Sequence, residues 1–327
     1  MTSHVLVTGG GGYIGSCLVA MLLERGYEVT VLDRFFFGNT VGPHKNLTLV
    51  HGDIRNCPPS VFEGIDAVCD LAALSNDPLG ELLPDTTYAI NHLGRARVCA
   101  LARAAGAKRY VLASSCSVYG FHDGIVDEKS PTNPLSVYAR ASLLAEQSTF
   151  ALADHHFSVT ALRQATIYGA SRRMRFDTAI NMMTLAAWKN GVIRVGRTGE
   201  QWRPYVHMRD TCRAFCLVLE SERSTVNGEV FNVGSDEQNA QVLPRAQMGC
   251  EAIGVPFKME WFGEPDDRSY QVGFGKLAAL GFATSRSFED GAREVYAGLV
   301  TGTLRDSPKT RTIEWYKRLL RRDPLCL

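Results

Sequence analysis

A phenol and a hydroxyl group stand at positions in this sequence where proton chemistry could take place. Tyr138 lies in SVYARASLLAE (136–146), which predicts the start of a helix, and Ser115 ends the apolar segment RYVLASS (109–115). A phenol has a pKa of about 10, so only about one in a thousand is ionised at pH 7, a deficit of about 4 kcal/mol. A phenolate base therefore needs a cation beside it. One helical turn after Tyr138, however, the sequence has Ser142.

A second chemical signal is the glycine-rich segment TGGGGYIG (8–15), between an apolar strand and a predicted helix. Gly9, Gly12 and Gly15 have the spacing that lets a backbone approach a pyrophosphate, with the N–H groups of a helix start as donors. Asp33 ends the next apolar segment, 18 residues after Gly15, where a carboxylate can accept both ribose hydroxyls and repel a 2′-phosphate. The pattern predicts an NAD site; a purely structural glycine turn is the alternative.

The elements that would position these residues follow from the apolar pattern. Strands are predicted at 4–8, 28–33, 46–53, 66–73, 109–115 and 158–163, and helices at 14–26, 85–105 and 136–154. Strands this uniformly apolar are typical of a parallel sheet covered by helices on both faces. We expect an α/β fold, a Rossmann-type doubly wound parallel sheet (1–165) with a smaller C-terminal substrate-binding lobe (166–327), some segments of which return to the first domain.

Composition excludes several function classes. The 327 residues carry 35 basic and 34 acidic side chains, a net charge of +1, which gives no electrostatic basis for binding nucleic acid or an acidic membrane. The nine cysteines form no CxxC pair, and Cys212 and Cys216 fit two small buried residues better than half a metal site, so no metal is predicted. The chain opens directly as a strand without a basic or long apolar leader, so we expect a cytoplasmic protein.

The spaced motifs resemble, nearly end to end, those of the extended short-chain dehydrogenase/reductases that act on nucleotide sugars. The matching segments are TGGGGYIG (8–15), HGDIR (51–55), LAA (71–73), SSCSVYG (114–120), LRQATIYG (162–169), EQWRPYVHMRD (200–210), FNVGS (231–235), and DDRSY with KLAALGF (266–282). The resemblance implies a Rossmann domain with a small substrate lobe, NAD as cofactor, and a nucleoside diphosphate sugar (UDP, GDP or dTDP) as ligand. It also implies a homodimer formed through a four-helix bundle of the helices at 85–105 and 136–154.

The resemblance also assigns residues to the two ligands. Cofactor contacts are expected from Gly9, Gly12, Tyr13, Ile14, Gly15, Asp33, Asp53 (to the adenine), Ile54, Leu71, Ala72, Ala73 and Tyr138. Substrate contacts are expected from Ser75, Asn76, Tyr168, Arg173, Arg203 and Arg268. Arg203 and Arg268 would bind the diphosphate. Arg173 stands where related enzymes for uronic acids carry an arginine near the sugar carboxylate, although a solvated basic loop explains it equally well.

In the family, hydride leaves a sugar carbon, usually C4, while the tyrosine takes the hydroxyl proton, and a YxxxK lysine favours the phenolate. Here that lysine position is Ser142. Four readings follow. Either a basic group from elsewhere reaches the phenol (Lys129, Arg163 or Arg173), or another base acts (His92, His122 or Cys116), or the nicotinamide charge alone suffices, or the chain is an inactive relative or a site-directed variant.

The residues after Ser115 indicate which reaction is expected. Resembling dehydratases carry Asp-Glu there and decarboxylases Ser-Glu, whereas this chain has Cys116 and Ser117, as many C4 epimerases do. Without an acid, elimination lacks its proton donor. The sequence thus favours an NAD-dependent nucleotide-sugar C4 epimerase, with Ser115, Cys116, Ser117, Tyr138 and Ser142 in the catalytic region. The alternatives are a dehydratase or reductase with another base, and a catalytically silent protein that binds NAD or a nucleotide sugar.

Overall fold

The computed structural model describes residues 3–264, 268–324 and 326–327. Asp266 and Asp267 of the predicted DDRSY motif lie outside the described residues. The chain divides into two compact units. The first contains residues 1–118, 134–163 and 212–231, and the second contains 119–133, 164–211 and 232–327. The sequence placed a boundary at residue 165 with some later segments returning to the first domain; in the structure, residues 119–133 also belong to the second unit, and the assignment of cofactor and substrate to separate units stays a prediction.

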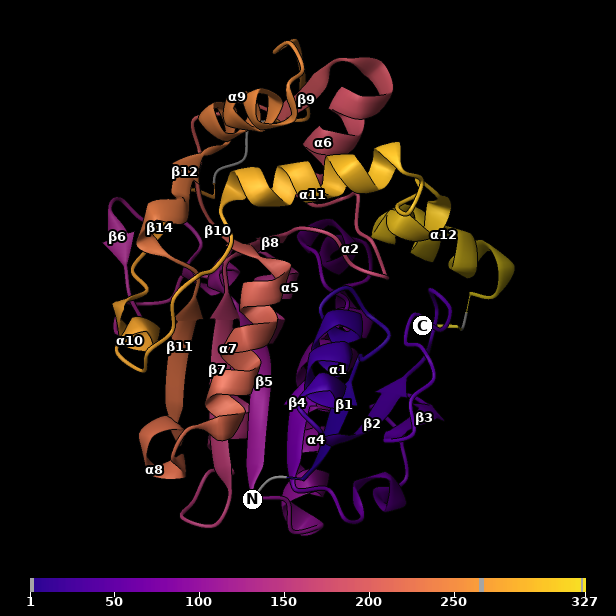
Figure 1. Ribbon diagram of the computed structural model, residues 1–327. Coiled ribbons are helices and arrows are strands. Elements are labelled where there is room, and N and C mark those ends of the chain that lie inside the picture. Colours follow the sequence, from indigo (N-terminus) through magenta and orange to yellow (C-terminus); the bar gives the residue numbers. More distant parts are fainter. Residues whose placement is uncertain (1–2, 265–267, 325) are drawn as a thin grey trace. The chain divides into compact units, whose positions relative to one another are not determined.

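A seven-stranded sheet forms the first unit, with strand order β11-β7-β5-β4-β1-β2-β3 (Figure 1). Its strands are β1 His4–Thr8, β2 Glu28–Asp33, β3 Leu47–His51, β4 Ala67–Asp70, β5 Arg109–Ser115, β7 Ser158–Gln164 and β11 Glu229–Val233. The pairs of β1 with β2, β1 with β4, β2 with β3 and β4 with β5 are parallel. The strand order reverses between β1 and β4, the place where doubly wound sheets bind ligands. The predicted Rossmann-type fold is confirmed.

Helices connect the strands of this sheet. They are α1 Gly15–Glu24, η1 Pro59–Phe62, α2 Asp77–Leu82, α3 Pro84–Tyr88, η2 Ala89–Gly94, α4 Arg95–Ala104, η3 Cys116–Tyr119, α5 Val137–Phe150, α7 Met208–Glu220 and α8 Arg223–Val226. In Figure 1, α1 and α7 lie in front of the sheet, and the Cys212 thiol of α7 donates to the carbonyl of Ile14, directly before α1. Cys212 and Cys216 are buried, as predicted.

The helix predicted at 85–105 consists of three helical segments that follow one another without a break, α3, η2 and α4. Between α3 and α4, the segment η2 is a π-helix. At its centre Asn91 is fully buried, and its side-chain amide both donates to and accepts from the backbone of Leu74. π-Helical turns of this kind often occur at functional sites. The irregular turn aims Asn91 at the segment that follows β4.

The core of the first unit is built from alternate residues of the central strands and one face of α4. Leu6, Val68 and Leu112 come from β1, β4 and β5, and they pack with Val98 and Ala102 of α4. Because these side chains have almost no exposed surface, the carboxyl ends of the strands stand on a rigid base. The residues that follow those ends are the ones predicted to bind the cofactor.

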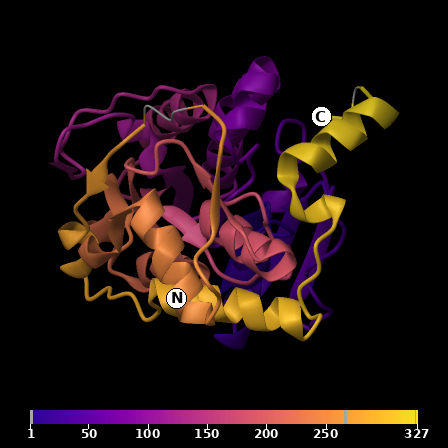
Figure 2. The same ribbon diagram turned by 90° about the horizontal axis from the view of Figure 1, so that it is seen from above.

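The second unit consists of small sheets and helices. Its strands are β8 Thr166–Tyr168, β10 Trp202–His207 and β12 Asn239–Gln241 in one sheet, β9 Ile193–Gly196 with β13 Met259–Phe262, and β6 Ile125–Val126 with β14 Gln271–Val272. Its helices are α6 Ala179–Asn190, η4 Asp236–Gln238, α9 Val242–Ile253, α10 Gly275–Ala278, α11 Phe288–Val300, η5 Pro308–Thr310 and α12 Thr312–Arg322. Helices α9 and α11 pack side by side (Figure 2). The pairing of β6 with β14 explains why residues 119–133 belong to this unit.

In the part of the chain that the structure describes, no helix has the length and apolar character needed to cross a membrane. Among those same residues, no group of three or more His, Cys, Asp or Glu side chains is arranged to hold a metal ion.

Candidate functional site

The glycine turn between β1 and α1 is packed too closely for side chains. The N–H of Gly12 donates to the carbonyl of Gly9 at 2.9 Å, which closes the turn. A Cβ atom on Gly9 would lie 2.8 Å from the nitrogen of Ala72, and one on Gly15 would lie 2.3 Å from the oxygen of Gly9. Gly9 also has φ +67°, a left-handed conformation that suits glycine. The turn thus leads the backbone directly into the start of α1 at Gly15, where N–H groups can face an anion.

Asp33 ends β2 next to this turn. Its carboxylate accepts the N–H of Gly11 at 2.9 Å and the N–H of Phe35 at 2.6 Å. The two bonds hold the carboxylate beside the glycine turn, the position that the sequence predicted for a ribose contact. Tyr13 and Ile14, also predicted to contact the cofactor, occupy the end of the same turn, and the Tyr13 side chain is 6% exposed.

Asp53 lies after β3 and is bound by two arginines. Arg34 Nη1 and Arg55 Nη2 lie 2.7 Å and 2.6 Å from its Oδ2 atom. Burial raises the pKa of this carboxyl, but hydrogen bonds from Arg55 and then Arg34 outweigh burial and lower the pKa to about 2. Its carboxylate therefore has a structural role, and the predicted adenine contact stays a prediction. Ile54 is buried in the core and packs against Gly94.

The segment Leu71–Ala73 is fastened to the glycine turn by a buried polar cluster that sequence reasoning missed. The Thr8 hydroxyl donates to Asp70, and its oxygen accepts the N–H groups of Leu71 and Ala72, both at 3.2 Å. The Tyr110 hydroxyl also donates to Asp70, which is fully buried. Burial raises the pKa of the Asp70 carboxyl. The apolar pattern of β4 and β5 shows only that these residues are buried, and the contact joins positions 40 residues apart.

The residues after Leu74 begin α2 and hold the start of α5. Asn76 caps α2, because its side-chain oxygen accepts the N–H of Leu79 at 2.9 Å. Asp77 accepts the hydroxyl of Ser136. Glu81 accepts the N–H of Val137 at 2.9 Å. Ser75 is exposed. The predicted contacts of Ser75 and Asn76 with a sugar stay predictions, and the capping role of Asn76 is a finding of the structure.

Tyr138 lies in the first turn of α5, as the sequence predicted. The Ser136 side chain caps the helix by accepting the N–H of Ala139 at 3.1 Å. One turn after Tyr138, Ser142 is 1% exposed, and its hydroxyl donates to the carbonyl of Tyr138 at 2.9 Å. A serine bonded in this way stays within its own helix. The position that holds a lysine in YxxxK thus carries a neutral, buried hydroxyl here.

The strand end at Ser115 presents hydroxyls and no acid. Ser115 Oγ donates to Ser117 Oγ at 3.0 Å and accepts the N–H of Ser117 at 3.1 Å. Cys116 is 1% exposed, and its thiol donates to the carbonyl of Arg163 at 3.3 Å. The Cys116 thiol is therefore a buried structural group, and its hydrogen is held by a backbone carbonyl.

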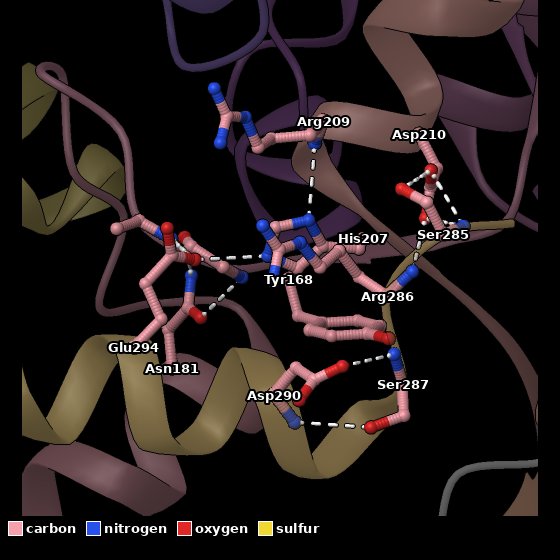
Figure 3. Close-up of polar contacts among 12 residues, drawn as sticks. Tyr168, Asn181, His207, Arg209, Asp210, Ser285, Arg286, Ser287, Asp290 and Glu294 are labelled. Carbon is pink, nitrogen blue, oxygen red and sulfur yellow. Dashed lines mark hydrogen bonds and ion pairs between the residues drawn. The ribbon is translucent and has the colours of Figure 1, made fainter.

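In the second unit, polar contacts tie the motif EQWRPYVHMRD (200–210) to the residue after LRQATIYG (162–169) and to residues 285–294 (Figure 3). His207 Nε2 lies 2.9 Å from Glu294 Oε2, which also accepts the N–H of Ala170. Asp210 accepts the N–H groups of Ser285 and Arg286. The network fixes the chain around Gly169 and the loop that leads into α11, so these motif residues have a structural function.

Tyr168 belongs to the core of this network. Its side chain is fully buried, and its hydroxyl donates to Gln238 Oε1 at 2.7 Å. Burial raises the pKa of this phenol above its ordinary value. Tyr168 was predicted to contact the substrate; the structure gives it a packing role between His207 and Phe288, and the substrate contact stays a prediction.

The three predicted substrate arginines of the second unit fall in two places. Arg203 Nη1 donates to the backbone carbonyl of Arg268, and its guanidinium lies 5.6 Å from the ring centre of Tyr270. The Arg203 side chain therefore contacts the backbone of Arg268, and the predicted contacts of both arginines with a diphosphate stay predictions. Arg173 is buried, and its Nη2 donates to Thr312 Oγ1 at 3.0 Å, at the start of α12. The predicted contact of Arg173 with a sugar carboxylate stays a prediction.

Comparison with known proteins identifies the family. Residues 5–234 match the model of the NAD dependent epimerase/dehydratase family. The chain belongs to this family. It is 28% identical over 274 residues to UDP-glucose 4-epimerase of Corynebacterium glutamicum, covering 78% of this chain and 82% of the relative. It is 26% identical over 307 residues to UDP-glucuronic acid decarboxylase 1 of Xenopus tropicalis, covering 88% and 70%.

Solved structures agree with this family. MoeE5 in complex with UDP-glucuronic acid and NAD superimposes with a TM-score of 0.83 at 27% identity, over 92% of this chain and 100% of that one. DesIV, a dTDP-glucose 4,6-dehydratase from Streptomyces venezuelae with NAD bound, gives 0.82 at 27% identity, over 92% and 98%. The resemblance to extended short-chain dehydrogenase/reductases is thus confirmed, and the enzyme is NAD-dependent.

The residues of this family member fit NAD. The close packing of Gly9 and Gly15 leaves the backbone free to approach a pyrophosphate, and Asp33 is held beside it by Gly11. The cluster of Thr8 and Asp70 fixes the segment 71–73 against the same turn. These features belong to one edge of the sheet, at the reversal between β1 and β4.

The structure also locates two of the groups considered as substitutes for the family lysine or tyrosine. Arg163 is buried and forms an ion pair with Glu146, 2.7 Å between Nη2 and Oε2. His92 Nε2 lies 2.8 Å from Ser148 Oγ. Ser148 is ten residues after Tyr138 on α5, which is about 15 Å along a helix. The idea that His92 replaces the tyrosine is therefore wrong. Lys129, His122 and Arg173 belong to the second unit.

Proposed function

We propose that this enzyme is a nucleotide-sugar C4 epimerase that oxidises and re-reduces its substrate, with Tyr138 as the proton acceptor and without a lysine beside it. The observation that carries the proposal is the pair of elements β5 and α5. Strand β5 ends at Ser115, and α5, which packs against it, begins with Tyr138 in its first turn. A hydroxyl and a phenol at these two positions can share one reacting oxygen of a sugar.

The proposed roles follow from the hydrogen bonds. Tyr138 Oη accepts the proton of the sugar hydroxyl and later returns it. Ser115 Oγ accepts the N–H of Ser117, and its hydroxyl, which donates to Ser117 Oγ in the structure, would turn to the reacting oxygen when the sugar binds. NAD, held by the glycine turn (9–15) and Asp33, would supply hydride transfer at C4. Ser142 supplies no positive charge to favour the phenolate, so we expect slower turnover than with a lysine at this position.

Epimerisation is favoured over elimination by the residues after Ser115. Elimination of water requires a general acid there. Cys116 is buried with its thiol on a carbonyl, and Ser117 is bonded to Ser115. The named relatives support either reaction, since they include UDP-glucose 4-epimerase and dTDP-glucose 4,6-dehydratase. Decarboxylation is carried out by another relative, UDP-glucuronic acid decarboxylase 1.

We further propose a nucleoside diphosphate sugar, with UDP, GDP or dTDP as the nucleotide, as the substrate. Arg203 and Arg268 are the proposed diphosphate contacts, because guanidinium groups bind phosphate oxygens in pairs. MoeE5 is described with UDP-glucuronic acid and with UDP-glucose, which supports a UDP-sugar. We expect a cytoplasmic homodimer built through the helices at 84–104 and 137–150.

Proton NMR of the purified protein with a panel of UDP-, GDP- and dTDP-sugars in deuterated water tests the proposal. A C4 epimerase converts one sugar into its C4 epimer without incorporating deuterium on carbon, and the Tyr138→Phe variant loses this conversion while still binding NAD. Deuterium on a carbon atom would instead indicate elimination or a C3 or C5 route. Either of those outcomes, or conversion by Tyr138→Phe at the wild-type rate, contradicts the proposal.

A second candidate is favoured by one observation, the neutral residue Ser142 in the place of the lysine. A protein that binds NAD and a nucleotide sugar without turning it over would tolerate this change. Tight binding of both ligands in calorimetry, with no conversion of any sugar in the panel, would support this candidate over the epimerase.

A further inference from the structure

A buried polar cluster of Ser114, Glu146 and Arg163 joins the two elements that carry the proposed catalytic residues. Glu146 and Arg163 side chains are 3% and 6% exposed. Their ion pair is bidentate, with 3.0 Å between Nε and Oε1 and 2.7 Å between Nη2 and Oε2. Ser114 Oγ donates to Oε1 of Glu146 as well. The proposed reaction uses none of these three side chains.

The cluster joins the elements that carry the chemistry. Ser114 precedes Ser115 in β5, Glu146 stands two turns after Tyr138 in α5, and Arg163 belongs to β7. The carbonyl of Arg163 also accepts the thiol of Cys116. One carboxylate thus links a strand, a helix and a second strand, all within the first unit.

A buried ion pair is a poor source of stability, because removing two charges from water offsets their attraction. Apolar residues of similar volume often serve stability equally well or better. A bidentate pair is directional, however, since each N–H must meet a particular oxygen. An apolar contact has no such direction and tolerates sliding, and one turn of sliding moves a helix by about 5.4 Å. The pair therefore determines where α5 stands along β5 and β7.

We propose that Glu146 and Arg163 are positioning residues, which hold Tyr138 at the separation from Ser115 that proton transfer requires. They act through the placement of α5 and do not touch the substrate. A misplacement of about 1 Å can cost about a hundredfold in rate. The inference rests on the proposed function, in which Tyr138 and Ser115 share one reacting oxygen.

The test compares a paired apolar variant with an ion pair elsewhere in the same unit. Glu146→Leu combined with Arg163→Met removes both buried charges together, so no charge is left unpaired. The control is a double variant, Arg25→Gln with Glu220→Gln, which removes an exposed ion pair. The two side chains are 38% and 43% exposed. Tm, the Kd for NAD, and kcat and KM for the sugar found in the NMR panel are measured for each.

We expect the paired apolar variant to keep its Tm and its Kd for NAD, to keep KM, and to lose kcat about tenfold to a hundredfold. The control keeps all four values. An unchanged kcat in the paired variant overturns the inference, and so does a loss of kcat that accompanies a loss of NAD binding, because that pattern indicates general loosening. If the paired variant does not fold, Ser114→Ala decides: reduced kcat at unchanged Tm supports positioning, and wild-type kcat overturns it.

Crystal structures of the wild type and the paired variant distinguish a failure of this inference from a failure of the proposed function. If the wild type converts no sugar, the epimerase proposal fails, yet the position of α5 can still be measured in the paired variant bound to NAD. A shift of Tyr138 relative to Ser115 then supports positioning. An unmoved Tyr138 overturns it.

Discussion

At the scale of single residues, the chemistry of this enzyme turns on what stands one helical turn after the phenol. Ser142 is buried, and its hydroxyl is used by the carbonyl of Tyr138. Two carboxylates, Asp77 and Glu81, hold the start of the same helix through Ser136 and Val137. Carboxylates at a helix start stabilise the helix dipole, but they do not favour a phenolate nearby. The arrangement secures the helix and leaves ionisation of the phenol to other charges.

Ser142→Lys is therefore expected to speed the proposed reaction. An ammonium one turn from Tyr138 favours the ionised phenol, and each unit by which the phenol's pKa falls gives about tenfold more phenolate at pH 7. We expect kcat at pH 7 to rise by about tenfold or more, with the gain shrinking toward pH 10 where the phenol ionises unaided. The measurement is kcat between pH 6 and pH 10 by NMR.

The uncharged variant Ser142→Met is the control for this change, because it places a straight side chain of similar length in the same buried position. It is expected to leave kcat no higher than in the wild type. An equal gain with methionine, or no gain with lysine at an unchanged Tm, would show that charge at this position does not limit the reaction.

Asp53 offers a prediction about stability and pH. Its pKa falls from 3.8 to about 2 in the folded protein. A lowered carboxyl pKa stabilises the fold above the unfolded value and stops doing so as pH falls through the folded value. Asp53→Asn should thus cost about 2 kcal/mol between pH 5 and pH 8, and about half as much at pH 3. Urea unfolding at several pH values measures this, with the exposed Glu24→Gln as control. A cost that does not change with pH would contradict the assignment.

Some of the site could be predicted from residue types and some could not. Gly9, Gly15, Asp33, Tyr138 and Ser142 occupy the places expected, because local spacing along one turn or one helix decides them. The links between Thr8 and Asp70, and between Ser114 and Glu146, depend on which strands become neighbours. Distant residues such as these look like ordinary core positions until the sheet order is known.

At the scale of elements, the strands were predictable because they are buried on both faces and therefore uniformly apolar. The helix at 85–105 was predicted without interruption, and the structure has a π-helix from Ala89 to Gly94 within it. A π-helix has about one more residue per turn than an α-helix, and the spacing of apolar residues in the sequence does not reveal so local a change. The short strands of the second unit carry too few residues for a pattern, so that region was expected only as a loose lobe.

The π-helical segment η2 predicts a large effect for Asn91. Its side chain satisfies both the N–H and the carbonyl of Leu74, and it is fully buried. Asn91→Leu leaves both backbone groups without these bonds, at a cost of about 3 kcal/mol. Asn56→Leu, on the exposed surface, is the control and should change stability little. Urea unfolding measures both. Equal stabilities for the two variants would show that the amide of Asn91 does not hold the segment.

At the scale of the whole molecule, the two units are discontinuous along the chain. Residues 119–133 reach the second unit through the pairing of β6 with β14, and residues 212–231 return to the first. Such crossings mean that neither unit corresponds to a single stretch of chain. A truncation near residue 165 would therefore remove α7 and β11 from the first unit and leave its sheet incomplete.

The homodimer expected from the family resemblance can be tested on the surface of the first unit. Leu93 of η2 is 61% exposed, and Leu143 and Leu144 of α5 are half-buried, which gives these neighbouring segments apolar side chains at the surface. If these segments form the interface, Leu93→Glu places a charge where water is excluded, which is costly. The wild type should then have twice the chain mass of 35.9 kDa in light scattering, and the variant only one chain mass.

Val300→Glu is the matched control for the dimer, because Val300 has the same 61% exposure but lies on α11 in the second unit. It should keep the wild-type mass, and both variants should keep the wild-type Tm in the presence of NAD if each unit folds unchanged. A monomeric wild type excludes the dimer. A dimeric Leu93→Glu moves the interface away from η2, and loss of the dimer only in Val300→Glu places the interface on α11.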